Sequence, residues 1–347
     1  MSDLIVPVVK VQNVRVHPNA DTLDLCDVLG YQVVVGRGQY KDGDLCVYFP
    51  MDVCLPSAVS EPLGCKKYLG GPEQTRVGRI KLRGEASFGI LIAKPEDQYW
   101  IEGDNVATYY GCTKWVGPVK FTSGDMAGYD ELIDPFFEEF THIQNGRIYS
   151  RVFEEGEYVI VTEKIHGANC RIGLINGIWV AGSHHTRRKL PEGEGDFTGY
   201  WTPMNYEGVR RMIMRLNELN DGKPVIIYGE LYGKGVQSLT YGCPNSQAFR
   251  AFGASVGGRY LSWTALSALA VHCGLEMCPV IWAGEYSLDK MKELADGKSR
   301  LADHMREGIV VYPVTERTHP KIGRVVLKFI GKEYLMSKHK DQELGEE

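Results

Sequence analysis

The segment YVIVTEKIHGANCRIGLI, at positions 158–175, constrains the fold more than any other part of the chain. β-branched residues fill both of its ends, which predicts two strands with Lys164 at their junction. A lysine on such a turn, beside small residues that let a ligand approach, has the setting that a covalent lysyl nucleophile needs. An exposed turn lysine without a function explains the same letters equally well, so the KxHGxN pattern alone does not decide between the two.

Length and composition describe an ordinary globular protein. At 347 residues the chain exceeds what one hydrophobic core usually organises, so we expect two domains. No segment approaches the roughly 18 apolar residues of a membrane span, and the N-terminus MSDLIVPVVKVQ lacks the features of a signal peptide. We therefore expect a cytoplasmic protein with no membrane partner. The nine cysteines contain no CxxC pair, which predicts reduced, buried thiols and neither a zinc site nor a disulfide framework.

The charge balance argues against a protein that coats nucleic acid non-specifically, because the formal net charge is −5. A local basic groove remains compatible with it. Three segments could line such a groove, although each could equally be a solvated face: RIKLR at 79–83, HHTRRK at 184–189 and VRRMIMRL at 209–216.

Residues 1–115 consist of short β-like runs separated by turn signals, which predicts a small β-barrel. The string VHPNADTLDLCDVLGYQVVVG, followed by GDLCVYF, resembles OB-fold modules that bind tRNA or other single strands. A barrel that serves only as a structural cap is the alternative. Residues 116–139 carry too many aromatic side chains for a flexible linker, so we expect a connection that packs.

Residues 140–347 alternate strands with a few helices, which predicts a second, α+β domain with mainly antiparallel pairing. One helix is expected to begin at Thr202 and Pro203 as N-cap and first turn. Two more helices are expected in WTALSALAVHCGL and in LDKMKELADG, the last closed by Gly297. The buried stripe of the first helix has helical spacing and comprises Val209, Met212, Ile213, Leu216 and Leu219.

Four further segments follow Lys164 in a fixed order: SHHTRRK at 183–189, VIIYGELYGKGVQ at 225–237, REGIVVYP at 306–313 and VVLKFIGK at 325–332. With KxHGxN they resemble the covalent nucleotidyltransferase superfamily of RNA ligases, DNA ligases and mRNA capping enzymes. KIHGAN and GELYGKGVQ look most like RNA ligases that seal nicks in duplex RNA. The OB-like module points to the class in which such a module precedes the nucleotidyltransferase domain, so the resemblance covers nearly the whole chain.

The resemblance implies a catalytic set of Lys164, Glu230, Glu307 and Lys328. Lys164 must lose its proton before it attacks the α-phosphorus of ATP, and the charges of Lys328 and of a divalent metal would favour the neutral amine. The two glutamates offer the hard oxygen ligands that Mg²⁺ or Mn²⁺ prefers, and Asn169 suits a metal-bound water or a ribose hydroxyl. A structural role remains open for both glutamates, because Glu before Gly at a strand start is common.

The same resemblance assigns the adenine site. Backbone groups of Glu163 and Ile165 would lie near the base, and Phe249 or Phe252 would stack on it. This chain has Gly253 where the family usually has an aspartate, so a core role for the phenylalanine is an equal alternative.

Two phosphate-binding motifs also depart from the family. His184 follows Ser183 where the family commonly has arginine, so Arg187 or Arg188 would take over the contact with ribose or a 5′-phosphate. The last motif lacks its second lysine next to Lys328, and Lys332 would compensate from the following turn.

These features predict an ATP-dependent RNA ligase that joins a 3′-hydroxyl to a 5′-phosphate through lysyl-AMP and an adenylylated 5′-end. Its partners would be ATP, Mg²⁺ or Mn²⁺, and nicked duplex RNA or RNA/DNA hybrid, with no obligate protein partner. The alternatives are an ATP-dependent DNA ligase or a GTP-using capping enzyme, which usually place their OB domain after the nucleotidyltransferase domain. A catalytically silent RNA-binding protein is a third alternative, and it would be expected to lose the nucleophile or the metal carboxylates.

Overall fold

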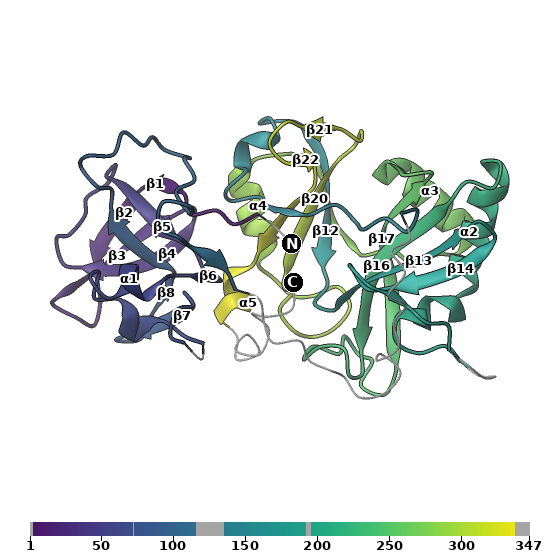
Figure 1. Ribbon diagram of the computed structural model, residues 1–347, viewed down its shortest axis with the longest axis horizontal. Helices are drawn as coiled ribbons and strands as arrows, with labels where there is room; N and C mark the ends of the chain where they lie inside the picture. The colour runs from purple at the N-terminus through teal and green to yellow at the C-terminus, as the bar shows by residue number, and fades with distance from the viewer. Residues whose placement is uncertain (1–2, 72, 116–134, 192–195, 337–347) are drawn as a thin grey trace. The chain divides into compact units, whose positions relative to one another are not determined.

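The computed structural model describes residues 3–71, 73–115, 135–191 and 196–336. These residues fall into two compact units, one up to residue 115 and one from residue 135, drawn from purple to blue and from teal to yellow in Figure 1. Most of the predicted connection at 116–139 lies outside the described residues. None of the described helices is long and apolar enough to span a membrane.

The first unit is built almost entirely from short antiparallel strands. They pair in the orders β1-β5-β9, β2-β3-β4, β7-β8 and β10-β6, and buried and half-buried residues alternate strictly along β4. The predicted small β-barrel is therefore confirmed. The elements of this unit are β1 (Val8–Lys10), β2 (Gln12–Val16), β3 (Leu23–Val28), β4 (Tyr31–Gly36), β5 (Leu45–Phe49), β6 (Val53–Cys54), α1 (Ser57–Ser60), η1 (Lys66–Tyr68), β7 (Arg79–Leu82), β8 (Glu85–Phe88), β9 (Ile90–Ala93) and β10 (Thr113–Lys114).

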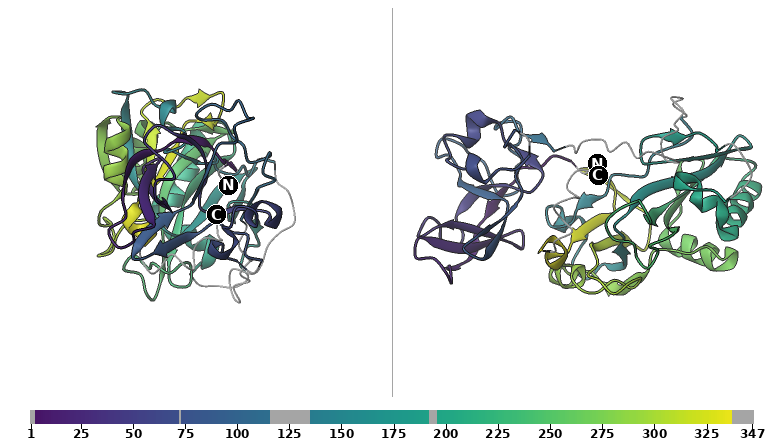
Figure 2. Two further views of the ribbon diagram at one scale, coloured as in Figure 1. Left: turned by 90° about the vertical axis from the view of Figure 1, so that its left-hand side faces the viewer. Right: turned by 90° about the horizontal axis from the view of Figure 1, so that it is seen from below.

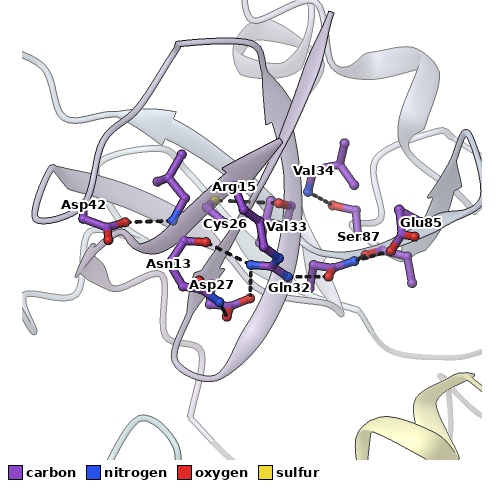
Figure 3. A network of polar contacts seen from close by, with 12 residues as sticks. Asn13, Arg15, Cys26, Asp27, Gln32, Val33, Val34, Asp42, Glu85 and Ser87 are labelled. Atoms are coloured by element: carbon purple, nitrogen blue, oxygen red, sulfur yellow. Dashed lines mark hydrogen bonds and ion pairs between the residues drawn. The ribbon is translucent and has the colours of Figure 1, made fainter. Parts of the chain in front are cut away.

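Polar side chains join the three-stranded sheet to the β7-β8 hairpin (Figure 3). Arg15 on β2 bridges to Asp27 on β3 at 3.2 Å and donates to Gln32 on β4 at 2.6 Å. Gln32 in turn donates to Glu85 at 3.1 Å, and the amide of Val34 donates to the Ser87 hydroxyl at 3.1 Å, both on β8. Strands β4 and β8 do not pair through their backbones in a ladder, and these side-chain hydrogen bonds join them instead.

The second unit contains a six-stranded antiparallel sheet in the order β15-β14-β13-β16-β17-β18. One face of this sheet packs against helices and forms the largest apolar core of the unit; Figures 1 and 2 show α2 and α3 in green beside these strands. The strands are β13 (Ala168–Ile175), β14 (Ile178–Gly182), β15 (Arg187–Arg188), β16 (Val225–Gly233), β17 (Gln247–Val256) and β18 (Arg259–Tyr260), and the covering helices are η3 (Gly199–Asn205), α2 (Glu207–Leu219) and α3 (Trp263–Cys273).

A second sheet of this unit has five strands in the order β11-β23-β20-β12-β19, and only β11 and β23 run parallel. Strand β12 of this sheet leads through residues 165–167 directly into β13 of the six-stranded sheet. The elements are β11 (Gln144–Asn145), η2 (Ser150–Val152), β12 (Tyr158–Lys164), β19 (Val280–Glu285), α4 (Leu288–Ala295), β20 (Gly308–Pro313), the hairpin β21 (Thr318–His319) and β22 (Gly323–Arg324), β23 (Leu327–Ile330) and α5 (Lys332–Met336). The α+β architecture with mainly antiparallel pairing is confirmed.

The three predicted helices exist, but the start of the first differs from the prediction. Thr202 and Pro203 lie inside η3, and α2 begins only at Glu207 after Tyr206. The first four residues of the predicted stripe are buried, whereas Leu219 is exposed at the end of the helix. Helix α4 ends at Ala295 with Asp296 as its C-cap, and the predicted closing residue Gly297 follows directly with a φ of 124°.

Candidate active site

Lys164 forms an ion pair with Glu307, although the two residues are far apart in sequence. Lys164 ends β12 and lies opposite Gly308, the first residue of the neighbouring strand β20. Glu307 precedes that strand, and its Oε1 atom is 2.7 Å from Nζ of Lys164. Strand pairing therefore brings a half-buried ammonium group against a buried carboxylate.

Glu230 and Asn169 approach from the six-stranded sheet. They lie opposite each other in the ladder between β16 and β13. Gly167 makes this approach possible, because a Cβ atom there would lie 2.2 Å from the Leu231 carbonyl oxygen and 2.9 Å from Cγ of Glu230. A glycine three residues after Lys164 thus lets the strand of Glu230 pack against the junction of the two sheets.

Two buried oxygen atoms at this junction have no hydrogen-bond partner among the described residues: Oδ1 of Asn169 and Oε2 of Glu307. Buried acceptors are normally satisfied by a donor, by water or by a cation. An all-oxygen set with unsatisfied acceptors fits a hard divalent metal.

Lys328 shares a sheet face with Lys164. On β20, Gly308 and Val310 point to one side, and they lie opposite Lys164 of β12 and Lys328 of β23, respectively. Since directly paired residues of adjacent strands point the same way, both lysine side chains leave the same face of the five-stranded sheet. Lys332, by contrast, begins α5 beyond the end of the strand, and it is exposed.

Glu163 and Ile165, which flank Lys164, are both buried. The Glu163 carboxylate points away from the Lys164 face and accepts the backbone amide of Arg300 at 2.7 Å and the hydroxyl of Ser299. Its own amide donates to the carbonyl of Pro279 at 2.9 Å. The Glu163 side chain therefore anchors the loop before β20. The backbone amide of Glu163 is used in its hydrogen bond to Pro279.

The two candidate phenylalanines lie on opposite faces of the six-stranded sheet. Phe249 is part of the apolar core beneath the helices. Phe252 contacts Phe140 edge-on with ring centroids 4.9 Å apart, and Phe140 also contacts Tyr228, which shares its face with Glu230. Only Phe252 is therefore on the side of the sheet that carries Glu230 and Asn169.

The register of β15 separates the two candidate arginines in the same way. Arg187 lies opposite Gly182, which lies opposite Arg171, and so shares the face of Asn169. Arg188 faces the helices, where its guanidinium group stacks 5.0 Å from the ring centroid of Tyr200. The alternation of a strand thus distinguishes two adjacent arginines that their spacing in the sequence could not.

Two further residues at the junction were not predicted. The hydroxyl of Tyr241 accepts the amide of His166 at 2.7 Å, and Nδ1 of His166 is 3.7 Å from Oε2 of Glu307. Burial raises the pKa of Tyr241, and the negative charges of Glu307, Glu163 and Glu230 raise it further. His166 stands inside KxHGxN and could have been found there, whereas no local pattern marks Tyr241.

Comparison with known proteins bears on both units. A model of the RNA ligase family matches residues 157–330, and a model of an OB-fold domain matches residues 5–94. No curated protein matches the chain.

Solved structures share the arrangement over nearly the full length. A ligand-free mutant of Naegleria gruberi RNA ligase has 21% sequence identity and a TM-score of 0.76, with 97% of this chain and 99% of that chain covered. The same enzyme with pyrophosphate has 22% sequence identity and a TM-score of 0.73, with 97% of this chain and 99% of that chain covered. A mutant with ATP and Mn has 21% sequence identity and a TM-score of 0.74 at the same coverage. At these identities the likeness shows a common fold.

Proposed function

This chain belongs to the RNA ligase family, and we propose from that premise that it is an ATP-dependent RNA ligase that works through a covalent lysyl-AMP intermediate. The observation that carries the proposal is the junction of the two sheets. There Lys164 is 2.7 Å from Glu307, with Lys328 on the same sheet face and Glu230 packed over Gly167. The known ligands of the Naegleria structures, ATP with Mn and pyrophosphate, support the choice of nucleotide.

In the first step Nζ of Lys164 bonds to the α-phosphorus of ATP, and the bond from that phosphorus to pyrophosphate breaks. The ion pair with Glu307 orients the amine but also stabilises its charged form, so the ammonium group must first release a proton to solvent before Nζ attacks. The positive charge of Lys328 acts in the opposite direction, because it disfavours a second ammonium group and stabilises the oxygens of the α-phosphate.

Glu307, Glu230 and Asn169 are the residues that would hold Mg²⁺ or Mn²⁺, the last through a water molecule. The unsatisfied Oε2 of Glu307 and Oδ1 of Asn169 support this assignment. When bound, the metal supplies positive charge to the phosphate oxygens. The protein contributes the paired residues Glu230 and Asn169 of the ladder between β16 and β13, and Glu307 directly before β20.

AMP then passes from Lys164 to the 5′-phosphate of a broken strand, and the adjacent 3′-hydroxyl attacks that phosphate and releases AMP. We assign the adenine platform to Phe252 and a phosphate or ribose contact to Arg187, since both share a sheet face with Asn169 or Glu230. Binding energy here serves mainly to position the two ends.

Residues 1–115 are assigned to binding of the RNA beside the break, and residues 140–336 to adenylyl transfer. Exposed aromatic side chains in the first unit support this division, because bases stack on such surfaces. Tyr99 is 99% exposed and Tyr109 57% exposed. Tyr109 packs edge-on against Trp100, with centroids 4.8 Å apart, which holds its ring in place.

The substrate is tested with nicked duplexes that carry RNA or DNA on each side of the break. We expect sealing of nicks in duplex RNA or RNA/DNA hybrid and little or no sealing of an all-DNA nick. Sealing of the all-DNA nick alone would instead make the protein a DNA ligase. Transfer of GMP but not AMP to the protein would favour a capping enzyme.

A further inference from the structure

A glutamate and two histidines meet at the edge of the six-stranded sheet, apart from the residues assigned to catalysis. His184 and His185 occupy the turn between β14 and β15, and Glu139 comes from the segment before β11. Their ligand atoms all lie within 4.8 Å of one another. Nδ1 of His185 is 2.8 Å from Oε1 of Glu139, and Nε2 of His184 is 3.6 Å from Oε2 of the same carboxylate.

The turn that carries the histidines is held at both ends. The amide of Ser183 donates to the carbonyl of Thr186 at 2.9 Å, and the amide of Thr186 donates to the Ser183 hydroxyl at 3.1 Å. The buried guanidinium of Arg171 donates to the carbonyls of Ser183 and Phe137 and so ties the turn to the opposite segment.

The segment that carries Glu139 is fixed as well. The Tyr260 hydroxyl donates to the Glu139 carbonyl at 3.2 Å and accepts the amide of Thr141 at 3.0 Å. The backbones that present all three side chains are therefore positioned by contacts that do not involve the three side chains themselves. Such preorganisation is what a metal site requires of its supporting residues.

We propose that Glu139, His184 and His185 bind one divalent transition-metal ion, with Zn²⁺ as the best match. Two imidazoles and one carboxylate are a common zinc ligand set, and three protein ligands leave a coordination position for water. Nε2 of His184 is buried and has no hydrogen-bond partner among the described residues. Since a buried ring nitrogen is normally satisfied by a partner, a metal ion could take that place. Binding would replace the contact between His185 and Glu139.

The ion would join the segment of Glu139 to the turn that leads directly into Arg187. Its role is therefore structural, in a part of the sheet separated by β14 and β13 from the strand of Glu230. This site does not depend on the proposed ligase reaction, and it differs in ligand type from the all-oxygen set of Glu230, Glu307 and Asn169.

The test is Zn²⁺ titration by calorimetry of the full chain, stripped with chelator, kept reduced and free of nucleotide. We expect one ion per chain, an affinity at least tenfold lower in Glu139→Gln, and loss of the site in His184→Ala/His185→Ala. The matched control is His272→Ala, which removes an exposed histidine on α3 and should bind Zn²⁺ like the unmodified chain. No binding, or equal binding by the unmodified chain and the double variant, would overturn the proposal.

A second measurement guards against misfolded variants and against zinc bound by the cysteines. Co²⁺ in an imidazole and carboxylate site gives weak visible bands, which Glu139→Gln should alter while circular dichroism stays unchanged. An intense near-ultraviolet sulfur-to-cobalt band would assign the ion to thiolates and contradict the proposal.

Discussion

At the scale of single residues, the proposed reaction depends on how the charge of Lys164 is balanced. Replacing Glu307 by glutamine preserves the shape of the side chain but removes the negative charge that orients the amine and that would bind the metal. We expect the rate of covalent AMP transfer to fall on the order of 10²–10³-fold, as for other preorganised electrostatic groups. The rate is measured by single-turnover labelling with ATP.

The matched control is Glu293→Gln, which removes an exposed carboxylate of α4 that pairs with Lys290 on the same helix. It should label at the unmodified rate. Equal rates for Glu307→Gln and the unmodified chain would remove Glu307 from the catalytic set.

Gly167 offers a test of the geometry rather than of the charge. A methyl group there would meet the Leu231 carbonyl oxygen at 2.2 Å, so β16 and Glu230 would have to move. We expect Gly167→Ala to lower the free energy of unfolding by about 1–3 kcal/mol, as overpacking typically does, and to slow AMP transfer. Denaturant unfolding and labelling measure the two effects; Gly78→Ala, which has no atom within 4 Å of the added methyl group, should leave both unchanged.

Much of this site was predictable residue by residue, but not all of it. The five ordered motifs indicated Lys164, Glu230, Glu307 and Lys328, and the ladders bring their strands together. Tyr241 contacts the site from a loop whose sequence carries no sign of it. The choice between Phe249 and Phe252 also needed the structure, because alternation along β17 only places them on opposite faces, and the structure shows that the helices cover the face of Phe249.

At the scale of elements, the barrel strands carry thiols into the apolar core. Cys26 on β3 and Cys46 on β5 are buried, and burial raises the pKa of each to about 12. An unfolded thiol ionises near pH 8.5, so above that pH the unfolded chain releases protons that the folded chain keeps. The stability contributed by each thiol is therefore complete below about pH 8.5 and is lost as the pH rises toward 12.

We accordingly expect the free energy of unfolding of the first unit to fall between pH 8.5 and 10, by up to about 1.4 kcal/mol per pH unit for each thiol. The decline should be shallower in Cys26→Ala/Cys46→Ala, whatever its stability at pH 7. Denaturant titrations across this pH range measure the slopes, with Cys243→Ala in the second unit as the control. Parallel slopes for the double variant and the unmodified chain would exclude these thiols as the cause.

Element boundaries were harder to predict than the elements themselves. The stripe from Val209 to Leu216 predicted α2 correctly, because its spacing matches one helical face. The start was placed too early because Thr202 and Pro203 are a good N-cap pair, yet here they belong to η3, where Thr202 instead donates to Gln247. A tertiary contact thus outweighed the local signal.

At the scale of the whole molecule, we assign RNA binding to the first unit and adenylyl transfer to the second. Tyr99→Ala/Tyr109→Ala should therefore weaken nick binding and sealing about tenfold or more, given a stacking contribution of about 1–3 kcal/mol per base. Covalent AMP transfer to Lys164 should continue at the unmodified rate.

Gel-shift and sealing assays on one nicked duplex, together with labelling, measure these effects. Tyr158→Ala, which removes an exposed tyrosine of the second unit, serves as the control. Unchanged sealing by the double variant would leave these two tyrosines without a role in RNA binding.

The order of the units was predictable because it rests on patterns within each unit: short strands with frequent turns first, longer strands and helices after residue 140. The strand pairing that forms the candidate site was harder to predict from the sequence. It depends on contacts between segments more than a hundred residues apart, such as Lys164 with Glu307, and it was inferred only through the resemblance to a known family.

Covalent labelling of the intact chain with radiolabelled ATP and Mg²⁺ or Mn²⁺, followed by denaturation and peptide mapping, measures whether Lys164 accepts AMP. We predict a denaturation-resistant label of one AMP per chain on the peptide that contains Lys164, and none in Lys164→Ala. No label on the unmodified chain, or equal label on Lys164→Ala, would exclude a lysyl-AMP intermediate at Lys164.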